Sequence, residues 1–167
     1  GIPGIRLIQS HRRFYPKGSL AAPLLGFTNE KNAGAYGMEQ ICDSFLRPRD
    51  GSVLYMRSRR GRQLYFAERR ERSALDGRDV YLTIDEPLQH IVEEELAQLH
   101  KQFAPQYSYA IMADPASGAI LAMAQLPSFD PNDRSRMDPK QWRNHMVSDV
   151  YHPGSAMKGI SICGALE

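Results

Sequence analysis

Tyr109-Ala110-Ile111-Met112-Ala113 and Ala119-Ile120-Leu121-Ala122-Met123-Ala124 are two nearly continuous apolar segments, joined by Asp114-Pro115-Ala116-Ser117-Gly118. Their lengths and the short polar connection predict an antiparallel β-hairpin. Strands that are apolar on both faces belong in a sheet that helices cover on each side. This stretch therefore predicts an α+β fold in which an antiparallel sheet packs between helices.

The residues before the hairpin predict a strand and one long helix. Residues 80–84 alternate as in a β-strand, and Asp85 follows as a candidate N-cap with Pro87 in the first helical turn. The helix should continue to about Phe103 and bury one apolar stripe, made of Leu88, Ile91, Val92, Leu96, Leu99 and Phe103. The polar residues off this stripe are expected on the surface without a chemical role: His90, His100 and Glu93-Glu94-Glu95.

A long irregular loop, residues 127–154, follows the hairpin and contains Pro127, Pro131 and Pro139. Loops of this length often carry a functional surface. Trp142 is expected to anchor the loop to the body of the protein, because burial of a large aromatic side chain is favourable.

The loop ends in Pro153-Gly154-Ser155-Ala156-Met157-Lys158, which predicts a turn that leads into a helix. Ser155 and Lys158 are three residues apart, so they share one side of a helix. A desolvated lysine amine near the helix N-terminus can take the serine proton, which would make Ser155 a nucleophile and Lys158 its base. The same pattern also occurs by chance in ordinary exposed helices, so it needs support from the rest of the chain.

The first part of the chain shows no long helical period and predicts several short elements. These are a strand within residues 5–8, a helix or strand over residues 20–27 closed by Gly26, a helix over residues 36–46, and a hairpin of residues 53–56 and 64–67. A turn at Asp76-Gly77-Arg78-Asp79 predicts a boundary between two domains, residues 1–76 and residues 77–167.

The charge of the chain gives little support to a nucleic-acid partner, since the net charge is only +2 over 167 residues. One basic cluster has two interpretations, an RNA-binding surface or a solvated strand pair. We favour the strand pair, because no stacking motif of a nucleic-acid module accompanies the cluster. Its members are Arg57, Arg59, Arg60, Arg62, Arg69, Arg70 and Arg72.

The remaining observations concern the two cysteines, apolar runs that could span a membrane, and the start of the chain. Cys42 and Cys163 lie among apolar residues without metal-ligand spacing, which favours two buried free thiols over a disulfide. No apolar run approaches the roughly 18 residues of a membrane helix. Because the chain starts at Gly1 without a methionine or signal peptide, we expect a piece of a longer protein whose membrane anchor would precede Gly1.

Six motifs follow one another along nearly the whole chain. They are Arg13-Phe14-Tyr15-Pro16-Lys17-Gly18 with Leu25-Gly26-Phe27-Thr28-Asn29, Gly37-Met38-Glu39, Leu82-Thr83-Ile84-Asp85, the hairpin from Asp114-Pro115 to Met123, Pro127-Ser128-Phe129-Asp130-Pro131-Asn132, and Arg143-Asn144 with Pro153-Gly154-Ser155 and Lys158. Together they resemble the motifs of class B penicillin-binding proteins. The Gly26-Phe27-Thr28-Asn29 stretch is most similar to the septal, cell-division type.

This resemblance implies a peptidoglycan D,D-transpeptidase that cross-links stem peptides in cell-wall synthesis. Residues 1–76 would be the C-terminal part of its non-catalytic pedestal domain, and residues 77–167 the start of its transpeptidase domain. Ser155 would attack the D-Ala-D-Ala carbonyl with Lys158 as base, and β-lactams would acylate the same serine. No metal or cofactor is implied. The implied partners are other division or elongation proteins, including a polytopic membrane glycosyltransferase, and the implied location is the outer side of the bacterial cytoplasmic membrane.

The sequence departs from the family pattern after Ser155, where it has neither Ser-x-Asn nor Lys-Thr-Gly. Ser148-Asp149-Val150 resembles the first of these motifs only in part and precedes the nucleophile. We therefore expect a chain cut just after its Ser-x-x-Lys motif, with little transpeptidase activity of its own. The alternative function is a non-catalytic interaction module of the division machinery, formed by the pedestal residues 1–76.

Overall fold

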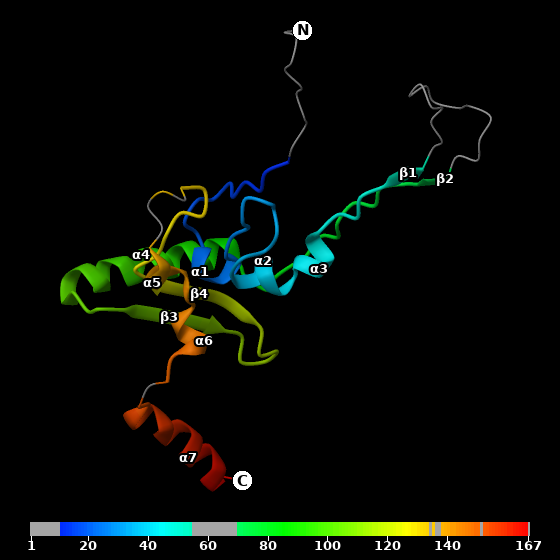
Figure 1. Ribbon diagram of the computed structural model, residues 1–167. Helices are drawn as coiled ribbons and strands as arrows, with labels where there is room; N and C mark the ends of the chain where they lie inside the picture. The colour runs from blue at the N-terminus through cyan, green and yellow to red at the C-terminus, as the bar shows by residue number, and fades with distance from the viewer. Residues whose placement is uncertain (1–10, 55–69, 134, 136–137, 151, 167) are drawn as a thin grey trace, which may run out of the picture.

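The computed structural model describes residues 11–54, 70–133, 135, 138–150 and 152–166 (Figure 1). Its centre is the antiparallel hairpin of β3 (Ser108–Ala113) and β4 (Ile120–Leu126), with α4 (Glu86–Phe103) lying against it. The other elements are α1 (Ala22–Leu25), α2 (Gly37–Ile41), α3 (Asp43–Leu46), β1 (Ser52–Leu54), β2 (Arg70–Arg72), α5 (Pro139–Trp142), α6 (His145–Ser148), η2 (Gly154–Ala156) and α7 (Met157–Leu166). The described residues thus form the predicted mixture of helices and antiparallel strands.

The hairpin forms where the sequence predicts it, with Ser108 opposite Leu126. Asp114 organises the connection, because its carboxylate accepts hydrogen bonds from the backbone N–H groups of Ala116 and Ser117 and from the Ser117 hydroxyl. These contacts, the Ser117 hydroxyl first, lower the pKa of the Asp114 carboxyl. β4 is largely buried, whereas Tyr109, Ile111 and Met112 of β3 are 43%, 52% and 38% exposed.

Helix α4 begins and ends as the sequence predicts. The Asp85 carboxylate caps it by accepting a hydrogen bond of 3.0 Å from the Leu88 N–H, and Pro87 lies in the first turn. The segment before it is different, because residues 80–84 form no strand. They are tied to β4 only through individual contacts such as the Thr83 hydroxyl to the Ile120 carbonyl at 2.6 Å.

The buried side of α4 differs from the predicted apolar stripe. Ile91, Leu99 and Phe103 are 53%, 50% and 69% exposed, while Gln89 is fully buried. The Gln89 amide accepts a hydrogen bond from the Met123 N–H at 2.7 Å and donates one to the Met123 carbonyl at 2.9 Å. An apolar helix face would leave these two backbone groups of β4 unpaired, at a cost of about 1–3 kcal/mol each, so the glutamine faces the strand.

Glu93 also lies on the buried side of α4, although the sequence placed it on the surface. Its carboxylate accepts hydrogen bonds of 2.7 Å from both the Gln89 side-chain amide and the Ala21 backbone N–H. The Ala21 N–H belongs to the start of α1, so Glu93 connects α1 to α4 and, through Gln89, to β4. His100 is half-buried rather than exposed, and its Nδ1 lies 2.9 Å from the Ser108 hydroxyl.

Polar contacts join the N-terminal segment to the loop after the hairpin and to α2. Asn132 clamps Tyr15, accepting from its N–H at 3.0 Å and donating to its carbonyl at 2.8 Å. Arg13 forms a two-pronged ion pair with Glu39, with nitrogen–oxygen distances of 2.7 and 3.2 Å. This hydrogen-bonded pair raises the pKa of Arg13. Segments more than a hundred residues apart are therefore held together by polar contacts.

An aromatic cluster packs beside these contacts and confirms that Trp142 anchors the loop. The ring of Phe27 lies 5.1 Å from Trp142, 5.9 Å from Tyr36 and 6.0 Å from Phe129, measured between centroids. Phe129 is only 5% exposed. Aromatic pairs at these separations contribute about 0.5–1.5 kcal/mol each beyond the burial of their area.

Gly26 allows the close approach of α1 and α2. It ends α1, as predicted, with φ of +74°, and a Cβ built on it would lie 1.9 Å from the Tyr36 carbonyl oxygen. Only glycine fits such a site, because both the backbone angle and the neighbouring backbone exclude a side chain.

Replacing Gly26 with alanine is expected to lower the free energy of unfolding by about 3 kcal/mol or more. Gly118 provides a matched control, since it has φ of +73° but nothing within 4 Å of its built Cβ. Gly118→Ala should therefore cost only about 1 kcal/mol, the backbone strain alone. Urea unfolding followed by the fluorescence of Trp142, the single tryptophan, measures both variants. Equal losses would show that the α1–α2 contact is not as close as the structure has it.

The remaining sequence predictions have mixed outcomes. The helix predicted over residues 36–46 is two short helices, α2 and α3, which meet at Cys42. Cys42 and Cys163 are free, but Cys42 is half-buried and Cys163 exposed, so neither is the buried thiol expected. β1 pairs antiparallel with β2, whereas the strands predicted over residues 5–8 and 64–67 lie outside the described residues. The same holds for most of the arginine cluster.

Among the residues that the structure describes, no helix is both long and apolar enough to cross a membrane. The predicted domain boundary near Gly77 remains a prediction. Arg78 donates its N–H to the Phe45 carbonyl at 2.7 Å, so α3 contacts the chain immediately after that point.

Candidate active site

Ser155 and Lys158 lie where η2 (Gly154–Ala156) runs into α7 (Met157–Leu166). Pro153 precedes the turn with helical backbone angles, and Gly154 has φ of +53°, which is favourable for glycine. The serine belongs to the 3-10 turn and the lysine to the first turn of the helix. The structure therefore contains the turn-to-helix transition that the sequence predicts around these two residues.

Both candidate residues are exposed in this chain. In Figure 1, α7 extends away from the body, and its Met157, Ile160 and Ile162 side chains are 46%, 67% and 59% exposed. Within the described part of the chain, no hydrogen bond joins Ser155 to Lys158. The start of α7 is exposed in this chain, and the roles of Ser155 as nucleophile and Lys158 as base stay predictions.

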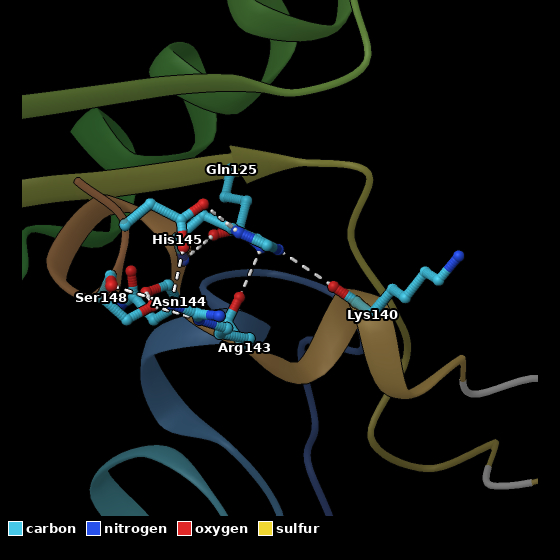
Figure 2. A network of polar contacts seen from close by, with 7 residues as sticks. Gln125, Lys140, Arg143, Asn144, His145 and Ser148 are labelled. Carbon is cyan, nitrogen blue, oxygen red and sulfur yellow. Dashed lines mark hydrogen bonds and ion pairs between the residues drawn. The ribbon is translucent and has the colours of Figure 1, made fainter. Parts of the chain in front are cut away.

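The segment that leads to this turn is fixed to the end of β4 by Gln125 (Figure 2). Gln125 is 3% exposed, and its amide donates to the Arg143 carbonyl at 2.9 Å and accepts from the His145 N–H at 2.8 Å. Gln125 thus holds residues 143–145 as Gln89 holds Met123, by pairing with a backbone N–H and a backbone carbonyl at once.

His145 is the most enclosed charged or titratable side chain of this segment, with 8% of the residue exposed. Its Nδ1 lies 2.6 Å from a carboxylate oxygen of Asp149, and its Nε2 lies 3.0 Å from the Lys140 carbonyl oxygen. Its ring stacks at a tilt on Tyr107, with centroids 4.4 Å apart. One imidazole therefore connects α5, the end of α6 and the chain before β3.

Arg143 binds the end of the same segment, Ser148 and Asp149, through its partly exposed guanidinium. Its guanidinium lies 2.9 Å from Asp149 and donates two hydrogen bonds of 2.8 Å to Ser148, one to the hydroxyl and one to the carbonyl. The Ser148 hydroxyl in turn donates to the Asn144 carbonyl at 2.6 Å. Residues 140–149 therefore form one hydrogen-bonded unit that ends six residues before Ser155.

Neither Gln125 nor His145 was predicted as a site residue from the sequence. Arg143 and Asn144 were recognised only as motif residues, and Ser148-Asp149 only as a partial likeness to another motif. The one sequence signal was a glutamine directly after the apolar strand, a residue type that needs hydrogen-bond partners once it is buried. Among the described residues, no group of three His, Cys, Asp or Glu side chains is placed to hold a metal ion.

Two family models match this chain. The model of the penicillin-binding protein dimerisation domain matches residues 1–82, and the model of the penicillin binding protein transpeptidase domain matches residues 108–167. The chain belongs to the penicillin-binding proteins. In this family, the Arg13–Glu39 region falls in the dimerisation domain, and the Ser155–Lys158 turn falls in the transpeptidase domain.

Curated relatives agree with this assignment to the penicillin-binding proteins. The peptidoglycan D,D-transpeptidase FtsI of Escherichia coli K12 is 34% identical over 166 residues, which are 99% of this chain and 28% of that protein. The stage V sporulation protein D of Bacillus subtilis is 34% identical over 167 residues, 99% of this chain and 26% of that protein. The chain thus spans less than a third of the length of the curated relatives it matches.

Solved structures of penicillin-binding proteins show the same fold. Penicillin binding protein 3 from Mycobacterium tuberculosis matches with a TM-score of 0.76 and 31% identity, over 92% of this chain and 31% of that one. A peptidoglycan synthetase from Bifidobacterium adolescentis matches with a TM-score of 0.78 and 28% identity, over 92% and 28%. The class B membership and α+β fold inferred from the sequence motifs are confirmed.

Proposed function

We propose that the full-length protein, meaning this chain continued to the length of its relatives, is a peptidoglycan D,D-transpeptidase. The observation that carries the proposal is a serine and a lysine one helical turn apart at the start of α7. They lie within the part of the chain that matches the transpeptidase family model. Relatives with this name cover 99% of the chain, which supports the same reaction here.

In the proposed mechanism, the Ser155 hydroxyl oxygen attacks the carbonyl carbon of the D-Ala-D-Ala amide in a stem peptide. The Lys158 amine accepts the hydroxyl proton, and the terminal D-Ala leaves with a proton on its amine. The acyl-serine then passes to the amine of a second stem peptide, which forms the cross-link and frees Ser155. A β-lactam opens at its amide bond in the first step and leaves Ser155 acylated.

We expect the 167-residue chain by itself to show little of this activity. Ser155 and Lys158 are both exposed in it, so the reacting groups lack an enclosed site that excludes water. Oxyanion donors also contribute about 10²–10³ in rate, and Ser155 needs such donors from its surroundings. The remainder of the transpeptidase domain, present in relatives more than three times as long, would supply this environment.

The proposal extends to location and partners. Cell-wall cross-linking takes place outside the cytoplasmic membrane, so the body of the full-length protein would lie there, held by an N-terminal anchor. The septal, cell-division type is favoured by the Gly26-Phe27-Thr28-Asn29 stretch. Its protein partners would then be other division proteins, including a membrane glycosyltransferase.

The decisive experiment is to incubate the full-length protein with a labelled penicillin and map the added mass by peptide digestion. We expect one added penicillin mass, on the peptide that contains Ser155. Addition at another serine, or no addition to a folded protein, would contradict the proposed function. The isolated 167-residue chain, treated in parallel, tests the expectation that it is not acylated.

A second candidate function is an interaction module within residues 1–76. The observation that favours it is a hollow lined by Phe45 and Leu75, which are 54% and 55% exposed, together with Arg47 and Arg49 of the same part of the chain and Arg78 just beyond it. Apolar side chains surrounded by arginines are typical of protein interaction surfaces. Binding to division proteins that survives the loss of the Ser155 hydroxyl would support this second function.

A further inference from the structure

His145 makes two hydrogen bonds that both require a donor on the imidazole. The Lys140 carbonyl oxygen, 3.0 Å from Nε2, can only accept a hydrogen bond. The ionised Asp149 carboxylate, 2.6 Å from Nδ1, can also only accept. A neutral imidazole carries one N–H and can satisfy one of the two. The structure therefore assigns His145 the doubly protonated, positively charged form.

The charged groups around the ring are consistent with an imidazolium. Asp149 compensates its charge directly and is shared with the Arg143 guanidinium at 2.9 Å. Tyr107 contributes a ring face, which attracts a cation. The Lys140 ammonium extends away from His145 in Figure 2, so only its carbonyl acts on the ring. His145 donates to two acceptors that belong to opposite ends of the segment 140–149.

These contacts determine where the chain leaves the body of the protein. Gln125 fixes residues 143–145 to the end of β4, and the His145 ring then fixes Asp149. Only residues 150–154 separate Asp149 from Ser155, and η2 begins at Gly154. Asp149 is therefore the last residue of the hydrogen-bonded unit 140–149 before the short connection to the nucleophile.

We propose that His145 is a positioning residue for Ser155 and that it acts in its charged form. The inference rests on the proposed transpeptidase function. A ring with a single N–H leaves either Asp149 or the Lys140 carbonyl without a donor. Residues 145–149 then move relative to β4, and the serine is less accurately placed for acylation. Misplacement on this scale commonly costs between tenfold and a hundredfold in rate.

The test measures the rate constant for acylation of the full-length protein by a labelled penicillin between about pH 5.5 and pH 8.5, the range in which histidine commonly titrates. The glutamine of His145→Gln has a single NH2 group, which can reach only one of the two acceptors. The rate constant for acylation should therefore fall about tenfold at low pH. His145→Arg keeps a permanent charge and several donors, so it should retain acylation at high pH.

The ratio of the His145→Arg rate constant to the wild-type rate constant is the sharpest readout, because the ionisation of Lys158 affects both proteins and cancels. This ratio should rise with pH. His100→Gln is the matched control, since it removes a half-buried histidine whose ring nitrogen lies 2.9 Å from the Ser108 hydroxyl at the start of β3, and it should leave acylation unchanged at every pH.

A variant that fails to fold does not decide the test, because nitrogen-15 NMR of the wild-type full-length protein, labelled at histidine, reports the His145 ring directly. We expect both ring nitrogens to carry a proton, one donated to Asp149 and one to the Lys140 carbonyl. A neutral ring at low pH, or a flat ratio with normal His145→Gln acylation, would overturn the proposal. Absence of acylation in the wild-type protein at every pH would instead refute the proposed function.

Discussion

Acylation by a labelled penicillin is expected to disappear when Ser155 of the full-length protein is replaced by alanine. The hydroxyl oxygen of Ser155 is the atom that forms the ester in the proposed mechanism, and alanine has no atom that can replace it. Ser155 is exposed, its backbone carbonyl accepts from the Met157 N–H, and its hydroxyl forms no hydrogen bond within the described residues, so loss of the hydroxyl should leave the fold unchanged. Intact mass before and after labelling measures the loss.

Ser161 provides the matched control for this variant. It lies on the same helix, α7, and is exposed, and its hydroxyl donates only to the Met157 carbonyl at 3.2 Å. Ser161→Ala should therefore be acylated at the wild-type rate. A Ser155→Ala protein that still gains one penicillin mass would show that another residue is the nucleophile. The proposed roles of Ser155 and Lys158 would then be wrong.

The central elements of the fold were predictable because their signals are local. The apolar runs on both sides of Asp114-Pro115-Ala116-Ser117-Gly118 give the hairpin, and Asp85 with Pro87 gives the start of α4. Gly26 and Trp142 were also placed correctly, as a helix end and an anchor. Each of these residues acts through its own backbone preference or its own size, so a sequence shows it directly.

The buried polar contacts were not predictable in the same way. Apolar periodicity selected Ile91, Leu99 and Phe103 for the buried side of α4, yet Gln89 and Glu93 face β4 and α1. These two are buried because specific backbone groups far along the chain need partners, and periodicity carries no information about that need. His145 and Gln125 escaped notice for the same reason.

The candidate site shows the same division between a motif and its surroundings. The positions of Ser155 and Lys158 in one helical turn followed from their spacing and from the Pro153-Gly154 turn. Their exposure did not, since burial depends on what packs against α7. A sequence motif names the reacting groups, whereas the protonation of those groups is decided by neighbours that lie elsewhere in the chain.

Lys158 is therefore the residue whose role depends most on the rest of the protein. In this chain the Lys158 side chain is exposed, and within the described residues no hydrogen bond joins it to Ser155. In the full-length protein, burial of the α7 side chains Met157 and Ile160 would enclose the lysine as well. The exposed apolar residues of α7 are consistent with such a cover.

Replacing Lys158 with methionine in the full-length protein should slow acylation by about 10²–10⁴, the usual contribution of a positioned general base. Methionine keeps an unbranched, apolar stem of similar length, so packing around α7 should be preserved. Stopped-flow acylation at saturating penicillin separates this loss of the chemical step from weaker binding. Lys101→Met is the matched control, because Lys101 is an exposed lysine on α4, remote from Ser155 in the chain. If Lys158→Met reacts as fast as Lys101→Met, then Ser155 is activated by another group, and the Ser155–Lys158 spacing has no catalytic meaning.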